Sequence, residues 1–391
     1  MISGFCILIA CASRDWFYLM NNAVNIQNLM RTAMPEQAGS LQPFQRCMVL
    51  AGGGFRFGYY LGMYAACEKY GRKPDVILAS CGAAIAAAII QRLPDDRQRR
   101  QWLASEEMYE FWQQLRPNPD KTLLSALGGV LNRALFSGTV RHIPDLFNDY
   151  LFTLPDQMQL PPQAASDHSP AVAIIAGRLL YGAGEVGQLR QGRPLFAETV
   201  FADQRVARLL ADAVSPVAND LIRSSTVAPG IHVRTDISLE DAVRASISDM
   251  VYFRCHQIGE DFYLGGVLDL FPIELAHRLA PEVIMERKGF YSRFLDLPAV
   301  RAVLGIHGNK RLRSVLRQRA DVWIDTADMQ IALVRHQILP QLDWRHNQLG
   351  LRMPDSYEAY QEMFRLQWEY GYRKAIHALR MQRQQFSSVH S

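Results

Sequence analysis

The chain has 391 residues, of which 49% are hydrophobic and 20% are charged. This composition excludes a disordered, collagen-like or coiled-coil protein, and the length is sufficient for one large domain with its own core. The net charge of +4 is too small to favour nucleic acid as a partner. Six widely spaced cysteines without metal-ligand spacing favour a reducing compartment, and they predict neither a metal site nor a disulfide framework.

Residues 1–45 precede the first clear strand pattern, and we interpret them as an N-terminal extension. Residues 8–11 (Leu-Ile-Ala-Cys) resemble a lipoprotein cleavage box, but no Lys or Arg precedes them. No apolar run reaches the roughly 18 residues that a membrane-spanning helix requires. We therefore expect a cytoplasmic protein, peripheral to the membrane, with a lipoprotein anchored through Cys11 as the alternative.

Apolar runs alternate with helical patterns from residue 47 onward. Residues 47–51 form a short apolar run that ends in three glycines, and residues 59–70 have a helical pattern. A second apolar run at 75–79 precedes an Ala-rich helical pattern at 83–92. This order of strands and helices predicts a parallel sheet with helices on both faces.

The remainder of the chain continues this alternation. We interpret residues 96–152 as helical. Residues 154–170 contain four prolines and are interpreted as a surface loop. Residues 238–248 are interpreted as a helix that begins with a capping box. Residues 357–383 are predicted to form a long amphipathic helix. Further strands are predicted at residues 171–176, 194–201, 262–264, 282–285 and 321–324.

Three consecutive glycines, Gly52, Gly53 and Gly54, follow the first predicted strand and precede a helix. Their uncovered backbone N–H groups, at the positive end of a helix dipole, are suited to bind an anion. The spacing satisfies neither the dinucleotide fingerprint nor the P-loop, and no supporting lysine follows. The loop is therefore predicted to form an oxyanion hole, with a simple tight turn as the alternative.

Ser80 lies at the junction between the second predicted strand and the Ala-rich helix. A nucleophilic serine needs a sharp strand-to-helix turn with small neighbours, which Ala79, Gly82 and Ala83 supply. The alternative role is an N-cap. In a parallel sheet the glycine loop and this turn each follow their own strand, so the loop can bring its donors beside the hydroxyl. We interpret Cys81 as a buried side chain that only fills space in the core and points away from the site that Ser80 occupies.

These motifs resemble those of the patatin-like phospholipase family, over residues 46–385, with residues 386–391 as a tail. Members of that family carry three motifs in order: a GGGxR-type loop, GxSxG and DGG. In this sequence Gly52 to Gly54 with Arg56 match the loop, and Ser80 and Gly82 match the second motif. Leu264, Gly265 and Gly266 occupy the positions of the third motif. The resemblance implies a three-layer α/β/α fold with a mainly parallel central sheet. It also implies a Ser-Asp catalytic dyad and hydrolysis of lipid acyl esters without a metal or an organic cofactor.

The third motif departs from the family pattern, because Leu264 stands where the resembling family has its dyad aspartate. Loss of a positioned base typically removes about 10² to 10⁴ in rate. Asp261 and Asp269 flank the motif and are the possible substitute bases, although Asp261 is expected on the opposite strand face. Further departures are Phe57, Leu78 and Leu270.

Two functions of different class follow. The first is a lipid acyl hydrolase of the serine esterase or phospholipase A type with Ser80 as its nucleophile. The second is a catalytically impaired protein that binds a lipid or a protein partner without turnover. Lys310, Arg313 and Arg317 share one face of a predicted helix, and about 1 kcal/mol per cation near an anionic leaflet would help docking on a membrane. A solvated basic face is the alternative.

Overall fold

The computed structural model describes residues 42–122, 140–162, 168–218, 226–291, 296–343 and 345–389. Contacts divide the chain into residues 1–42 and residues 43–391, and the fold described below is that of the second unit. Most of the predicted N-terminal extension, with Cys11, lies outside the described residues. Within the described ranges no helix is both long enough and apolar enough to cross a membrane.

A nine-stranded sheet forms the centre of this unit. Its strands are β1 (Arg46–Leu50), β2 (Val76–Ser80), β5 (Ala171–Leu179), β6 (Phe196–Phe201), β7 (His232–Arg234), β9 (His256–Ile258), β10 (Asp261–Leu264), β11 (Glu282–Arg287) and β12 (Val322–Asp325). The order is β12-β11-β1-β2-β5-β10-β9, with β6 paired to β5 and β7 paired to β6. All pairs from β12 to β5 are parallel, whereas β5–β6, β5–β10 and β9–β10 are antiparallel. The predicted α/β fold with a mainly parallel central sheet is confirmed.

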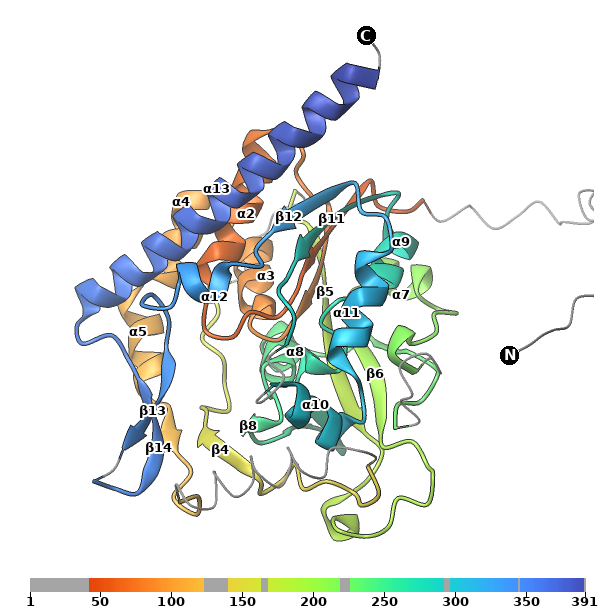
Figure 1. Ribbon diagram of the computed structural model, residues 1–391, viewed down its shortest axis with the longest axis vertical. Helices are drawn as coiled ribbons and strands as arrows, with labels where there is room; N and C mark the ends of the chain where they lie inside the picture. Colours follow the sequence, from red (N-terminus) through yellow and green to blue (C-terminus); the bar gives the residue numbers. More distant parts are fainter. Residues whose placement is uncertain are drawn as a thin grey trace, which may run out of the picture. The chain divides into compact units, whose positions relative to one another are not determined.

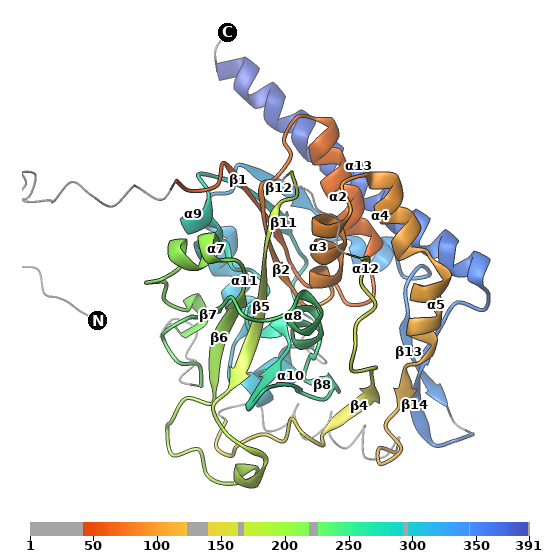
Figure 2. The same ribbon diagram turned by 180° about the vertical axis from the view of Figure 1, so that it is seen from behind.

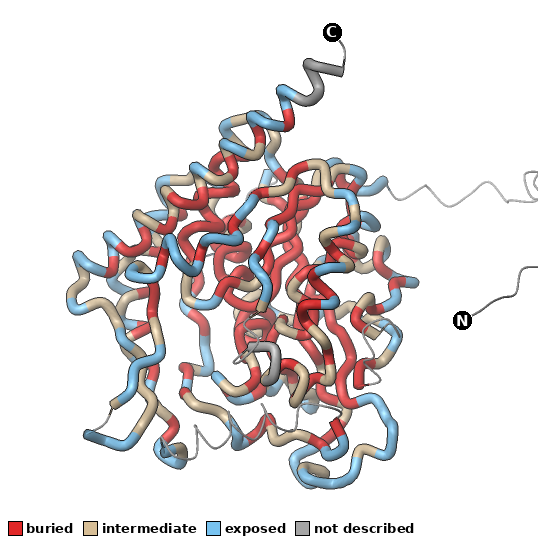
Figure 3. Tube along the Cα trace, in the orientation of Figure 1, coloured by how far each residue is buried: buried red, intermediate tan, exposed pale blue. Residues whose placement is uncertain are grey.

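Helices cover both faces of the sheet (Figures 1 and 2). One face carries α2 (Gly58–Lys69), α3 (Ala83–Arg92), α8 (Leu239–Ser246) and α13 (Tyr357–Val389), and the other carries α7 (Gln204–Leu209), α9 (Ile273–Leu279) and α11 (Gly308–Leu316). Side chains along β1 alternate between the two layers: Met48 and Leu50 join the first apolar cluster, and Cys47 and Val49 join the second. Figure 3 shows the strands as the buried centre of the unit.

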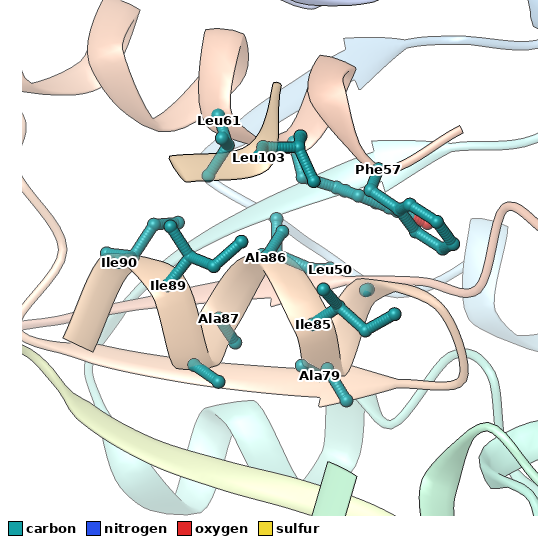
Figure 4. Packing of buried hydrophobic residues seen from close by; sticks show 14 of the residues in the cluster. Leu50, Phe57, Leu61, Ala79, Ile85, Ala86, Ala87, Ile89, Ile90 and Leu103 are labelled. Carbon is teal, nitrogen blue, oxygen red and sulfur yellow. The ribbon is translucent and has the colours of Figure 1, made fainter. Parts of the chain in front are cut away.

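Helix α3 is buried from Ala83 to Ile90, and it follows directly on the turn that ends β2. Figure 4 shows Ile89 and Ile90 facing Leu61 of α2 and Leu103, the last residue of α4 (Asp96–Leu103). Because α3 is packed on every side, its first turn cannot shift without disturbing the core. The position of residues 80–82 is therefore fixed by the packing of the helix that follows them.

The helical interpretation of residues 96–152 is wrong for part of that range. Helices α4 and α5 (Glu106–Gln113) are present, but β3 (Arg116–Pro117) and β4 (Tyr150–Thr153) form a small sheet with β8 (Val251–Phe253). A pairing between segments so far apart in the chain leaves no local periodic signal. Residues 123–139, and residues 163–167 of the predicted surface loop, lie outside the described ranges. The remaining helices and strands are α10 (Asp296–Leu304), α12 (Met329–Ala332), β13 (Leu339–Asp343) and β14 (Gln348–Arg352).

Helix α13 runs alongside α2 (Figures 1 and 2), and the two helices approach each other at glycines. A Cβ added to Gly62 would lie 2.1 Å from the carbonyl oxygen of Trp368, and one added to Gly371 would lie 1.9 Å from that of Tyr59. Gln367 of α13 also accepts a hydrogen bond from the N–H of Gly58, at 2.9 Å. The long C-terminal helix thus holds the start of α2, where the glycine loop ends.

This packing predicts that Gly371→Ala lowers the free energy of unfolding by about 1–3 kcal/mol, because the added methyl group forces the two helices apart. The matched control is Gly184→Ala, since a Cβ at Gly184 meets no atom within 4 Å. The control should leave stability unchanged or slightly raised. Urea unfolding of both variants measures the difference, and equal stability would show that α13 is not held to α2 in this way.

Candidate active site

The turn between β2 and α3 directs Ser80 and Cys81 to different partners. Ser80 is wholly buried, and its hydroxyl donates a hydrogen bond to the carbonyl oxygen of Asp269 at 2.9 Å. Cys81 has φ +53°, a left-handed conformation that is uncommon for a residue other than glycine. Its thiol donates to Oδ1 of Asp249 at 3.0 Å. A strained residue on a strand-to-helix turn is how a nucleophile elbow presents its reactive side chain, and here that residue is Cys81.

The glycine loop lies directly against this turn. A Cβ added to Gly52 would lie 3.1 Å from Cβ of Cys81 and 3.3 Å from its Sγ. Gly54 has φ +63°, and a Cβ added to Gly82 would lie 2.6 Å from the Gly54 carbonyl oxygen. Within the described ranges the amides of Gly52, Gly53 and Gly54 make no hydrogen bond. The loop therefore has free donors beside the thiol, as the oxyanion-hole hypothesis requires, and that hypothesis stays a prediction.

Asp249 is the carboxylate of this centre. Burial raises the pKa of Asp249 to about 7, although the hydrogen bonds that it accepts from the Cys81 thiol and the Val267 amide act in the opposite direction. Burial, and then the charge of Asp249, raise the pKa of the Cys81 thiol well above its usual value. At neutral pH the thiol therefore keeps its proton, and a half-ionised carboxyl group lies in position to accept it.

The glycines of the third motif make room for this pair. A Cβ added to Gly265 would lie 2.0 Å from Oδ1 of Asp249, and one added to Gly266 would lie 2.7 Å from the Cys81 amide nitrogen. Leu264 itself is buried in an apolar cluster. The Asp249 carboxylate thus lies against Gly265, the residue after Leu264, although it comes from a different segment of the chain.

The two sequence-predicted substitute bases are engaged by arginines. Oδ2 of Asp269 is buried and lies 3.0 Å from Nη2 of Arg311. Oδ2 of Asp261, a partly exposed residue at the start of strand β10, lies 3.4 Å from Nη1 of Arg234. The structure brings the backbone of Asp269, and not its carboxylate, to Ser80. A catalytic role for either carboxylate stays a prediction that these contacts do not favour.

Sequence reasoning missed Asp249, for which only a weak signal exists. The residue lies three positions after Ser246, in a small-residue segment that follows α8. Ser246 connects this segment to the elbow, because its hydroxyl accepts the Cys81 N–H at 2.9 Å and donates to the carbonyl oxygen of Ile175 at 2.6 Å. Periodicity and spacing do not report such a contact between distant segments.

Two cavities open beside the centre. The larger has a volume of about 760 Å³ and a mainly apolar lining that includes the glycine loop and Lys288. The smaller has a volume of about 280 Å³ and is lined largely by aromatic and aliphatic side chains. Gly54, Arg56, Asp249, Tyr252 and Pro340 line both. Concave apolar spaces with a few convergent polar groups are typical of sites for small ligands.

A buried polar network anchors the start of the glycine loop. Oε1 of Glu286 accepts the N–H of Ala51 at 3.1 Å, and Oε2 accepts the hydroxyl of Tyr59 at 3.0 Å. Nζ of Lys288 lies 3.0 Å from Oε2 of the same carboxylate. Because each charge in this network has an opposite charge or a hydrogen-bond partner, the network holds the loop without an unpaired buried ion.

Arg56 contributes a positive charge that forms no ion pair with a carboxylate in the described part of the chain. Its Nη1 donates to the carbonyl oxygen of Gly53 at 2.8 Å, and its Nε is buried without a hydrogen-bond partner among the described residues. None of the ion pairs found in those residues includes Arg56. Burial lowers the pKa of this guanidinium. The place where the two cavities meet is therefore suited to a negatively charged group.

A family model described as patatin-like phospholipase matches residues 48–277, which is more than half of the chain. The chain therefore belongs to the patatin-like phospholipase family. Among solved structures, that of VipD from Legionella pneumophila aligns over 91% of this chain and 73% of its own, with 10% identity and a TM-score of 0.35. No curated protein matches the chain.

Proposed function

We propose that this protein is a lipid acyl hydrolase in which Cys81 is the nucleophile and Asp249 is the general base. Family membership supports lipid acyl esters as the substrate class. The observation that carries the proposal is the 3.0 Å hydrogen bond from the Cys81 thiol to Asp249, at a turn where Cys81 alone has the left-handed conformation. Ser80 then has a structural role through its bond to Asp269. Ser80 as nucleophile, as the sequence predicts, is the alternative that the experiments below separate.

The proposed reaction proceeds through a thioester. Asp249 accepts the thiol proton while the sulfur of Cys81 attacks the ester carbonyl carbon, and the glycine-loop amides donate hydrogen bonds to the negative charge on the carbonyl oxygen. Collapse of this intermediate breaks the ester bond, and Asp249 returns the proton to the departing alcohol. Water then attacks the thioester, its proton passes by way of Asp249 to the sulfur, and the fatty acid leaves.

The site also supports a lipid that carries a negative charge. The apolar lining of the larger cavity suits an acyl chain. Arg56, at the junction of the cavities, suits a phosphate, because a guanidinium forms paired hydrogen bonds with phosphate oxygens. A phosphate-bearing ester lipid satisfies both features.

Replacing the proposed nucleophile should abolish turnover. Cys81→Ala is expected to lower the hydrolysis of 4-nitrophenyl octanoate at least about 10³-fold, because the attacking atom is lost. Ser80→Ala, the matched control one residue away, should retain activity within about tenfold of wild type. Loss of activity in Ser80→Ala with retention in Cys81→Ala would overturn the assignment. Absence of turnover in the wild type would instead favour lipid binding without catalysis.

The general base sets the pH dependence. Because Asp249 must be ionised to accept the proton and its pKa is about 7, kcat/KM should rise about tenfold per pH unit below pH 7 and level off above it. Asp249→Asn should remove this rise and lower the rate about 10² to 10⁴-fold. Initial rates from about pH 5 to about pH 8.5 measure the profile. A rate that decreases as pH rises through this range would contradict the assignment.

The predicted basic face is exposed and lies beside the larger cavity. Lys310, Arg313 and Arg317 are exposed on or at the end of α11, whereas the neighbouring Arg311 is buried in its ion pairs. The guanidinium of Arg313 lies 5.7 Å from the centre of the Phe290 ring, which lines the larger cavity. We propose that this face docks the protein on an anionic membrane with the cavity towards the lipid.

Neutralising this face should weaken docking. A triple Lys310→Gln, Arg313→Gln, Arg317→Gln variant is expected to bind vesicles that contain phosphatidylserine about 10²-fold less tightly, since each cation contributes about 1 kcal/mol. Arg365→Gln is the control, because Arg365 is paired with Glu362 and Glu369. Vesicle flotation measures binding, and equal binding of the triple variant and the wild type would mean that the face is only solvated.

A further inference from the structure

The smaller cavity shares its boundary with the proposed catalytic centre. Both cavities are lined by Gly54 of the glycine loop, by the base Asp249 and by Arg56. A ligand that occupied both spaces would therefore have its central atoms at the loop and the carboxylate. A single acyl chain in the larger cavity leaves the smaller one without an assigned ligand.

The walls of the smaller cavity are mainly aromatic and aliphatic. Phe57 and Trp112 are stacked, with ring centres 5.0 Å apart and planes at 19°, and Phe55 meets Trp112 edge to face at 5.7 Å. Leu154 and Ile247 continue this lining. Apart from Gln337, the side chains that line this cavity alone are aromatic or aliphatic, and such a lining suits a hydrocarbon chain better than a sugar or an amino alcohol. The polar groups of the cavity lie mainly at its boundary with the larger one.

We propose that the smaller cavity binds the second chain of a two-chain ester lipid, whose first chain occupies the larger cavity. The branch of such a lipid, which carries its ester groups, then lies at the junction, which Gly54, Arg56 and Asp249 line. This inference rests on the proposed function for the place of the reacting ester. It adds that the second chain contributes to binding, so that one-chain lipids bind more weakly.

The test measures binding without turnover, in a Cys81→Ala background. The probes are dihexanoylphosphatidylcholine, with two chains, and hexanoyl-lysophosphatidylcholine, with one, and calorimetric titration gives each Kd. The two-chain probe should bind at least about tenfold more tightly, because a further apolar chain is buried. Leu154→Trp, which fills only the smaller cavity, should abolish this difference and leave the one-chain Kd unchanged.

The matched control fills the other cavity. Ala299 lines the larger cavity alone, so Ala299→Trp should weaken both probes. Leu154→Phe repeats the test with a smaller side chain if Leu154→Trp does not fold. Equal binding of the two probes, or an equal loss for both in Leu154→Trp or Leu154→Phe, would overturn the two-chain proposal. Failure of the proposed function is seen separately, as unchanged hydrolysis in Cys81→Ala.

Discussion

The candidate site depends on the close approach of several backbone segments to one turn. The glycine loop, the turn itself and the third motif approach their neighbours at Gly52, Gly82, Gly265 and Gly266. A Cβ at any of these glycines would lie only 2.0 to 2.8 Å from its nearest neighbouring atom. No other residue type allows backbones to come this close. The adjacent parallel strands β1 and β2 bring the first two segments together. Everything else in the site follows from the space that these glycines leave for one thiol and one carboxylate.

Strain and burial are concentrated at the same place. Cys81 has φ +53°, and Val251, two residues after Asp249, has φ +73° although it is β-branched. Conformations of this kind cost on the order of 1–3 kcal/mol each and persist only where the surrounding structure enforces them. Here the buried helix α3 holds the thiol, and the Glu286–Lys288 network holds the glycine loop opposite. A thiol, a carboxylate with a raised pKa and free amides are thus positioned before any substrate binds.

Much of this architecture can be predicted from the sequence, because local patterns determine it. Alternating apolar runs and helical patterns predict the parallel strands. The helix predicted at residues 83–92 has the same bounds as α3. The capping box predicted at the start of α8 is also present, because the Ser238 hydroxyl accepts a hydrogen bond from the Asp241 amide. The centre itself cannot be predicted in this way. Whether Ser80 or Cys81 faces the glycine loop depends on the backbone conformation of the turn, and Asp249 comes to lie against Gly265 of the third motif only through the fold. Family motifs locate the turn, but tertiary packing determines which of the two neighbouring side chains, Ser80 or Cys81, faces the glycine loop.

The most direct test identifies the residue that becomes acylated. Incubation of the protein with a long-chain β-lactone, followed by tandem mass spectrometry of its peptides, locates the covalent adduct that the activated nucleophile forms by opening the lactone ring. A thioester on Cys81, formed much more slowly in Asp249→Asn, is the predicted result. An ester on Ser80, with Cys81 unmodified, would contradict the assignment of Cys81 and Asp249 as the reacting pair.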